Sequence, residues 1–328
     1  MMKRSALVMA VGFSVGVVGC GGGDSDASGG QSGGIGTLWI ANEDTGSLRK
    51  VDSAKGDWEV VTMPSATTYI AFGAGAVWTV GEAEPKIYRV DPSSNEVVAT
   101  IDAVGPLRGI AADDSAVWVL EDATGGATHP PRVLRVDPAT NSIVATIDVA
   151  DINDQFDGIA MGEGTPYVAI GNGFAAVKID PTTNKVANSE PLGQAGGYGY
   201  GRIGYADGRL WIVDQSSDIL HELDPSNVKA LHSYDIKDEW AGFMAVGSKY
   251  VFIAYGDADQ LIAIDANTGA LAKEIDVKGK ARYLTRAKGK IICGLIDTDG
   301  GDIVLLDETS GAIDKVIPGV YGDNVAVQ

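Results

Sequence analysis

Three arginines hold similar positions in a chain that is otherwise poor in basic residues. The formal net charge is −19, yet Arg108, Arg202 and Arg282 each stand just before a short apolar run. An arginine beside an aspartate suits two-point recognition of a carboxylate or a sugar edge, and an aromatic ring adds a stacking surface. The alternative is a ring of salt bridges that only joins neighbouring elements. Aspartates and aromatic residues precede the other runs of this kind, so the predicted ligand site contains Tyr69, Arg108, Asp157, Arg202, Trp240, Arg282 and Asp323.

Groups suited to catalysis or metal binding are few. The histidines are His129, His221 and His232, too few for a multi-histidine copper site. His129 lies in a long loop and could act as an acid or base, but the sequence shows no partner for it. No cysteine–histidine cluster and no phosphate-binding glycine loop occurs. We therefore predict no catalytic residue and no cofactor.

Acidic residues occupy several short loops, including Glu121-Asp122. In one of these loops, Asp297, Asp299 and Asp302 are spaced much as in a calcium loop, where alternate carboxylates converge on a hard cation. The loop lacks the glutamate that usually closes such a site. We interpret these side chains as solvated turn carboxylates, with Ca²⁺ or another divalent cation as the alternative.

A unit that occurs seven times must position these side chains. In each unit an aspartate ends a short apolar run, and successive aspartates are 39 to 46 residues apart. A large aromatic residue precedes most of them by thirteen positions. A period of about 40–45 residues built from short β runs is typical of β-propellers. The aspartates are Asp52, Asp91, Asp137, Asp180, Asp224, Asp265 and Asp307.

Each unit divides into four short runs, named a to d from the axis outward, that are rich in β-branched and aromatic residues. In the second unit they are residues 70–72, 76–80, 86–90 and 96–101. The aspartate opens the turn between c and d, so we interpret the seven aspartates as turn formers rather than catalytic groups. Four residues later comes glycine or asparagine, which tolerates positive φ. The fifth turn reads as one residue shorter, and there Asn227 is expected to take that role.

The two ends of the repeat are complementary. Residues 37–40 form a b run with no a run before it, and residues 324–327 form an a run with no b run after it. Pairing the two completes the first blade and removes exposed sheet edges. We therefore predict an all-β fold, a closed seven-bladed β-propeller with four-stranded blades over residues 37–328.

Segments 116–119 (AVWV) and 135–147 (RVDPATNSIVATI) resemble the YVTN-type repeat of YncE-like propellers. More loosely, the domain is similar to the streptogramin B lyase propellers. The resemblance covers residues 37–328 and implies the fold rather than an activity. Lyase-like propellers place a histidine and acidic residues in a metal-dependent site. A His-x-Glu arrangement in a late-blade loop is missing here, so that activity is not carried over.

Three connections are longer than their counterparts in the other units: residues 122–131, 148–157 and 192–202. In a propeller, b–c loops and d–a connections emerge on the same face. We expect the three insertions to gather over blades three to five, where repeat proteins often bind ligands. They add His129, Tyr198 and Tyr200 to the predicted ligand site.

The first residues are typical of a targeting signal. Lys3 and Arg4 precede an apolar stretch too short to span a bilayer comfortably. The segment Val17-Val18-Gly19-Cys20 is similar to the lipobox of bacterial lipoproteins, which implies cleavage before Cys20 and lipid attachment to it; an ordinary secretory signal is the alternative. We predict a signal peptide over residues 1–19 and a glycine-rich tether over residues 20–36, with an r.m.s. reach of roughly 20–24 Å. Glycine after the lipidated cysteine favours the outer membrane, periplasmic or surface face, in a two-membrane cell.

The charge limits the possible partners. Loss of Lys3 and Arg4 takes the net charge from −19 to −21, which disfavours nucleic acid and anionic membrane surfaces. Membrane association is then expected through the lipid anchor alone. Once Cys20 is acylated, Cys293 has no intramolecular partner, and we interpret it as a small core residue. We expect a monomer.

Two functional hypotheses follow. The first is a non-catalytic cell-envelope lipoprotein whose propeller face binds an envelope protein, a peptide or a small polar ligand. The second is a metal-dependent enzyme of lyase or lactonase type that uses the acidic face together with His129. The scarcity of catalytic groups favours the first.

Overall fold

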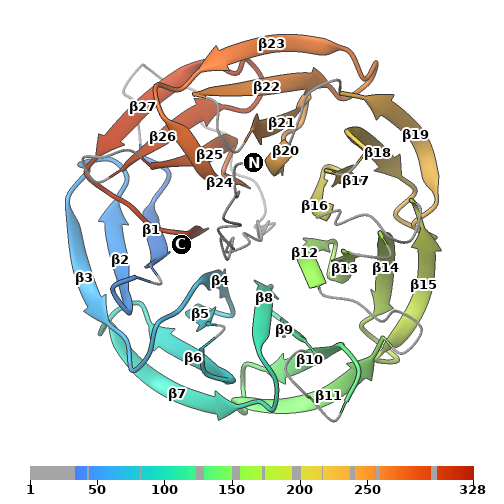
Figure 1. The fold of residues 1–328 in the computed structure, drawn as a ribbon. Helices are drawn as coiled ribbons and strands as arrows, with labels where there is room; N and C mark the ends of the chain where they lie inside the picture. Colours follow the sequence, from blue (N-terminus) through green and yellow to red (C-terminus); the bar gives the residue numbers. More distant parts are fainter. Residues whose placement is uncertain are drawn as a thin grey trace, which may run out of the picture.

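Seven antiparallel sheets surround a central axis, which confirms the predicted seven-bladed β-propeller (Figure 1). The computed structural model describes residues 34–42, 44–81, 83–122, 129–149, 156–171, 174–193, 201–215, 217–236, 241–255, 259–296 and 301–328. Within this part of the chain each sheet has four strands and forms one blade.

The strands of each blade follow one another from the axis outward in the order a, b, c, d. Blade 1 contains β28 (Asn324–Val327), β1 (Thr37–Asn42), β2 (Ser47–Asp52) and β3 (Trp58–Thr62). Blades 2 and 3 contain β4 (Tyr69–Gly73), β5 (Ala76–Val80), β6 (Lys86–Asp91), β7 (Glu96–Asp102), β8 (Leu107–Ala112), β9 (Val117–Glu121), β10 (Arg132–Asp137) and β11 (Ser142–Asp148). Blades 4 and 5 contain β12 (Phe156–Gly162), β13 (Thr165–Ile170), β14 (Ala175–Asp180), β15 (Lys185–Pro191), β16 (Gly201–Ala206), β17 (Arg209–Asp214), β18 (Ile219–Leu223) and β19 (Ala230–Asp235). Blades 6 and 7 contain β20 (Ala241–Val246), β21 (Tyr250–Tyr255), β22 (Gln260–Asp265), β23 (Leu271–Asp276), β24 (Lys280–Ala287), β25 (Lys290–Ile296), β26 (Asp302–Asp307) and β27 (Ile313–Pro318).

The ring closes through blade 1, as predicted. Strand β28 pairs antiparallel with β1, from Leu38 opposite Val327 to Ala41 opposite Asn324. The backbone N–H of Asp323 donates to the carbonyl of Ala41 at 2.8 Å, which extends the pairing by one bond. The C-terminus therefore lies beside β1 in Figure 1. Strands from the two ends of the repeat thus complete one sheet.

The repeated aspartates shape the turns between strands c and d, as predicted. Asp91 accepts hydrogen bonds at one carboxylate oxygen from the Ser93 hydroxyl at 2.6 Å and from the N–H groups of Ser93 and Ser94 at 2.7 and 3.2 Å. The hydroxyl bond, followed by the two backbone bonds, lowers the pKa of Asp91. The same bond from the N–H two residues later occurs in all seven turns.

The fifth turn differs from the sequence-based prediction. Val228, and not Asn227, adopts the left-handed conformation, with φ of 59°. Its N–H donates to the carbonyl of Asp224 at 2.7 Å, so this turn has the full length of the others. A β-branched residue is strained in this region, but the Val228 side chain is fully buried with Leu223 between blades 4 and 5, and that burial offsets the strain. In all seven turns the left-handed residue follows the aspartate by four: Gly56, Asn95, Asn141, Asn184, Val228, Gly269 and Gly311.

A cation from each blade binds the c–d turn of the next blade. In blade 3, Arg135 lies over the Trp118 ring at 5.2 Å and donates through one nitrogen to the carbonyl of Pro181 at 2.7 Å and the amide oxygen of Asn184 at 2.9 Å. Blade 1 makes the same pair of contacts with a lysine. The cations in ring order are Lys50, Arg89, Arg135, Lys178, Arg209, Lys273 and Lys315. These contacts join every blade to its neighbour, including blade 7 to blade 1.

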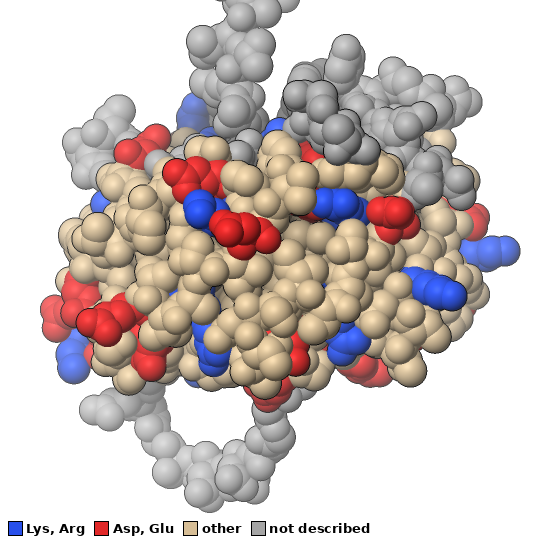
Figure 2. Space-filling view, turned by 90° about the horizontal axis from the view of Figure 1, so that it is seen from below, with Lys and Arg blue, Asp and Glu red and all other residues tan. Residues whose placement is uncertain are grey.

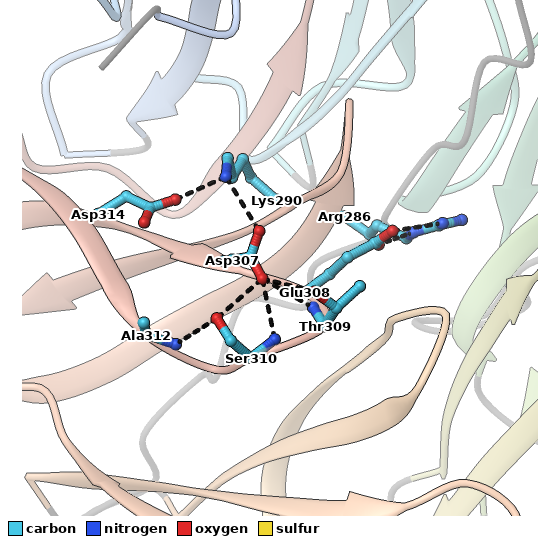
Figure 3. Close-up of polar contacts among 8 residues, drawn as sticks. All are labelled: Arg286, Lys290, Asp307, Glu308, Thr309, Ser310, Ala312 and Asp314. Atoms are coloured by element: carbon cyan, nitrogen blue, oxygen red, sulfur yellow. Dashed lines mark hydrogen bonds and ion pairs between the residues drawn. The ribbon is translucent and has the colours of Figure 1, made fainter. Parts of the chain in front are cut away.

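Blade 7 shows how ion pairs support such a turn (Figure 3). Asp307 accepts hydrogen bonds from hydroxyl and N–H groups of its own turn, and Lys290 lies 3.2 Å from it and 2.6 Å from Asp314. The hydroxyl bonds and the bond from Lys290 lower the pKa of Asp307, against the opposing effect of burial. Arg286 reaches Asp207 at 3.1 Å and so joins blade 7 to blade 5.

The hydrophobic core lies between the blades, since each sheet buries both faces against its neighbours. Trp39 of blade 1 packs in one cluster with Ile70 and Val77 of blade 2. Cys293 is fully buried in the cluster between blades 6 and 7, together with Phe252. Burial raises the pKa of the Cys293 thiol. The interpretation of Cys293 as a core residue is confirmed.

The outer wall of the disc carries charges of both signs. On the side shown in Figure 2, lysines and arginines alternate with aspartates and glutamates across the wall. The pair between Lys86 and Asp102, at 3.0 Å across strands β6 and β7, is one example. Within the described ranges, no helix is long and apolar enough to cross a bilayer.

Candidate functional site

The strand register places the predicted site residues on one face of the disc. Leu107, at the start of β8, pairs with Glu121 at the end of β9. Arg132, at the start of β10, pairs with both Glu121 and Asp148. The b–c loops and d–a connections therefore emerge on one face, here called the mouth face. The a–b hairpins and c–d turns emerge on the opposite face, here called the turn face.

The innermost strands of four blades carry a β-bulge where they begin on the mouth face. The register shifts fall between Leu107 and Gly109, Phe156 and Gly158, Ala241 and Phe243, and Ala281 and Tyr283. A bulge leaves one residue without a cross-strand partner and re-aims its side chain. In the described parts of blades 1, 2 and 5 the register is regular, so the fold itself does not require the bulge. The bulged residues are Arg108, Asp157, Gly242 and Arg282.

Arg108 is paired within its own blade. Its Nε lies 2.9 Å from a carboxylate oxygen of Asp122, which directly follows β9. The other oxygen of Asp122 accepts the backbone N–H of Phe156 in blade 4 at 3.1 Å. Asp122 is fully buried, whereas the Arg108 side chain keeps 20% of its surface exposed. This pair therefore connects blades 3 and 4 and still presents part of a guanidinium on the mouth face.

The neighbouring Glu121 corrects one sequence-based interpretation. Glu121 and Asp122 were expected to be solvated, but both are fully buried. Glu121 accepts the N–H groups of Val104 and Gly105 at 2.6 and 2.7 Å and pairs with Arg132. Burial opposes ionisation, yet these bonds hold the pKa of Glu121 below its usual value. Its physical role is to fix the connection that leads into blade 3.

Arg202 joins three consecutive blades. Its Nε donates to the carbonyl of Gly242 in blade 6 at 3.0 Å, and one Nη donates to the carbonyl of Asp157 in blade 4 at 3.2 Å. The guanidinium also lies 5.1 Å from the centre of the Phe243 ring. Arg202 is only 4% exposed and Asp157 only 2%. These contacts are those expected of the structural alternative, in which the arginines join neighbouring elements.

Arg282 faces the point where the ring closes. Its Nε lies 3.6 Å from a carboxylate oxygen of Asp323, an ion pair longer than a hydrogen bond. Asp323 is almost completely buried, while 22% of the Arg282 side chain is exposed. Tyr69, at the corresponding place in blade 2, is fully buried in the core between blades 2 and 3. Arg108 and Arg282 are thus the predicted cations that keep exposed surface on the mouth face.

His129 lies at the edge of this face. Its Nδ1 is 2.9 Å from the carbonyl oxygen of Pro130, and its ring lies against Gly105. Asp302 accepts the N–H of Gly319 at 3.1 Å. Within the described residues, no three His, Cys, Asp or Glu side chains gather closely enough to hold a metal ion. The remaining predicted residues, Tyr198, Tyr200, Trp240, Asp297 and Asp299, lie outside the described part of the chain.

Two features of the mouth face were not predicted from the sequence. Asp122 was not identified as the partner of Arg108, because a carboxylate in a loop is usually solvated. The bulges were not predicted either, although glycine follows the bulged residue in two cases, at Gly109 and Gly158. Glycine inside a strand pattern often marks a bulge.

Comparison with known proteins supports the fold. No family model matches the chain, and no curated protein matches its sequence. Among solved structures, Kuenenia stuttgartiensis hydrazine synthase is similar with a TM-score of 0.67 at 11% identity, over 89% of this chain and 97% of that one. The Cps50 (Swd1) β-propeller domain of Myceliophteria thermophila has a TM-score of 0.59 at 12% identity, over 81% and 94%. Dihydro-heme d1 dehydrogenase NirN, in complex with DHE, has a TM-score of 0.59 at 14% identity, over 89% and 75%. At such low identities these similarities show that the chain is a seven-bladed β-propeller protein.

Proposed function

We propose that this protein is a non-catalytic cell-envelope lipoprotein whose mouth face binds an envelope protein, a peptide or a small polar ligand. The observation that carries the proposal is the set of bulges. They place the charged residues Arg108, Asp157 and Arg282 at the bulged position, at the same end of three innermost strands. Because the described innermost pairs of blades 1, 2 and 5 have a regular register, the bulges are not needed for the fold, and this arrangement favours a role in recognition.

The charges on this face suit a ligand with both polar and anionic groups. Arg108 and Arg282 each expose about a fifth of the side chain, and each is held by a buried aspartate. Such pre-oriented guanidinium groups lose little further freedom when they bind a carboxylate. The proposal also includes lipid attachment at Cys20, localisation to the outer membrane of a two-membrane cell, and membership of the YVTN-type, YncE-like propellers, on the sequence features given above.

Affinity purification from native envelope tests this function. The tagged wild type is compared with a mouth-face variant, Arg108→Gln/Arg282→Gln, which retains hydrogen-bond donors toward the buried aspartates. The control, Lys185→Gln/Lys229→Gln, removes two exposed positive charges at the c–d turns of the opposite face. Partners are quantified by mass spectrometry, and an enriched partner is then titrated against each purified protein.

We expect the mouth-face variant to lose about tenfold or more in affinity for the enriched partner and the control to bind like the wild type, with all three proteins folded at the assay temperature. Equal binding by the two variants contradicts the mouth-face site. The enzyme hypothesis is tested by melting the protein with divalent metals and with chelator. A large metal-dependent shift that His129→Ala abolishes would support it instead.

A further inference from the structure

The described part of the chain begins on the turn face. The carbonyl of Gly36 accepts the N–H of Ser53 at 3.1 Å and its hydroxyl at 2.5 Å, and Ser53 belongs to the c–d turn of blade 1. Ile35 is buried in the cluster between blades 7 and 1. Gly34 lies against Ala54, so closely that an added Cβ would be 2.3 Å from the Ala54 nitrogen. Residues 34–36 are therefore fixed to the turn face.

Glycine is required at the point of exit. Gly36 has φ of 99°, a conformation that other residues rarely adopt. A Cβ at this position would lie 2.5 Å from the carbonyl oxygen of Gln328. Both restrictions require glycine at this position, directly before β1.

The mouth face lies one strand length away from this exit. Strand β1 starts on the turn face at Thr37 and ends on the mouth face at Asn42. Six strand residues span about 17 Å, since each step along a strand adds roughly 3.4 Å. The exit of the tether and the candidate site are therefore on opposite sides of the disc.

We propose that the anchored protein holds its turn face toward the membrane and presents its mouth face away from it. This inference rests on the proposed lipid attachment at Cys20. For a glycine-rich coil of the thirteen residues between Cys20 and Gly34, the expected r.m.s. reach is roughly 18–22 Å. Turning the mouth face to the bilayer would take the tether around the rim as well as across the thickness of the disc. The partner of the mouth face is accordingly a protein or solute that approaches from the side away from the membrane, and not the lipid headgroups of that membrane.

Energy transfer on vesicles tests this orientation. The lipidated full-length protein is reconstituted into vesicles with a headgroup-attached acceptor dye, and a donor is placed on single cysteines. In blade 3, Ser115→Cys labels the turn face and Val104→Cys the mouth face. In blade 6, Ser248→Cys labels the turn face and Gln260→Cys the mouth face. All four positions are exposed. Two blades are used so that tilt of the disc averages out. The buried thiol of Cys293 remains unlabelled in the folded protein.

The expected result is stronger transfer at Ser115→Cys and Ser248→Cys than at their mouth-face counterparts, in both blades. If the protein binds the vesicles but the energy-transfer efficiencies are equal or reversed within both pairs, the orientation is wrong while the lipid anchor is not contradicted. Absence of transfer at all four positions, with the same result for Cys20→Ala, shows instead that the lipid anchor is wrong. A mass measurement of the N-terminal peptide identifies the acyl group independently.

Discussion

Replacing Arg135 measures how strongly one blade is joined to the next. Arg135→Ala removes two hydrogen bonds from a charged donor, to Pro181 and Asn184, and one cation–π contact with Trp118. A hydrogen bond to a charged group contributes about 1.5–3 kcal/mol and the ring contact about 0.5–1 kcal/mol. Ordering the arginine costs about 2 kcal/mol of side-chain entropy. The net loss in the free energy of unfolding is therefore expected to be about 2 kcal/mol. This value is at the low end of the range that these contributions allow, because the side chain is only partly buried.

The chain contains its own control for this measurement. In blade 1, Lys50 makes the same two contacts, to Pro92 and Asn95, each at 2.9 Å. Arg135→Lys should therefore retain more than half of the stabilisation. In calorimetry, Arg135→Ala should lower the melting temperature by about 3 °C. A loss no greater than that of the exposed-site variant Lys185→Ala, or an equal loss for the lysine and alanine variants, refutes the role of these contacts.

Three further outcomes are expected. Deleting residues 323–328 removes β28 and should lower the melting temperature further than Arg135→Ala does; an unchanged melt contradicts the closure. Hydrogen bonds lower the pKa of Asp307 in the folded protein, so the stability that this carboxylate contributes is present above the unfolded pKa, about 4, and is lost as the pH falls through the folded pKa. Asp307→Asn should therefore make the free energy of unfolding less dependent on pH in this range. An acid unfolding profile that the substitution does not alter opposes the assignment. Burial lowers the pKa of His221 in the folded protein, so the unfolded chain binds the proton more readily and the protein becomes less stable as the pH drops below about 6.5. His221→Phe should reduce the loss of stability between about pH 7 and 5. The same loss of stability in the wild type and the variant argues against this effect.

The repeat made the architecture predictable, because each turn carries its own chemistry. Asp91 and Asn95 mark the start and the left-handed residue of a c–d turn, and the pattern recurs around the ring. It failed at Val228, where the deciding factor is packing between two blades rather than local preference. Sequence alone offers no measure of how much strain such burial will offset.

The candidate site was predictable only in position. The place of Arg108, Arg202 and Arg282 at the start of innermost strands followed from counting strands. Their partners did not follow, because Asp122 has the sequence pattern of a solvated loop carboxylate and Gly242 meets Arg202 only after the blades have packed. The cations that join one blade to the next follow a pattern in the sequence, since Arg89 and Arg135 stand two residues before their turn aspartates. That signal is easily taken for an ordinary exposed charge.

Closure by β28 makes the assembly of this protein depend on the order in which the chain emerges. Asn324–Val327 follow every other described strand in the chain, yet they form the inner edge of the first blade. During synthesis, the inner hydrogen-bonding groups of β1 therefore stay unpaired until the last segment has been made. A prematurely terminated product keeps that open edge, which is a template for pairing with other β strands and for aggregation.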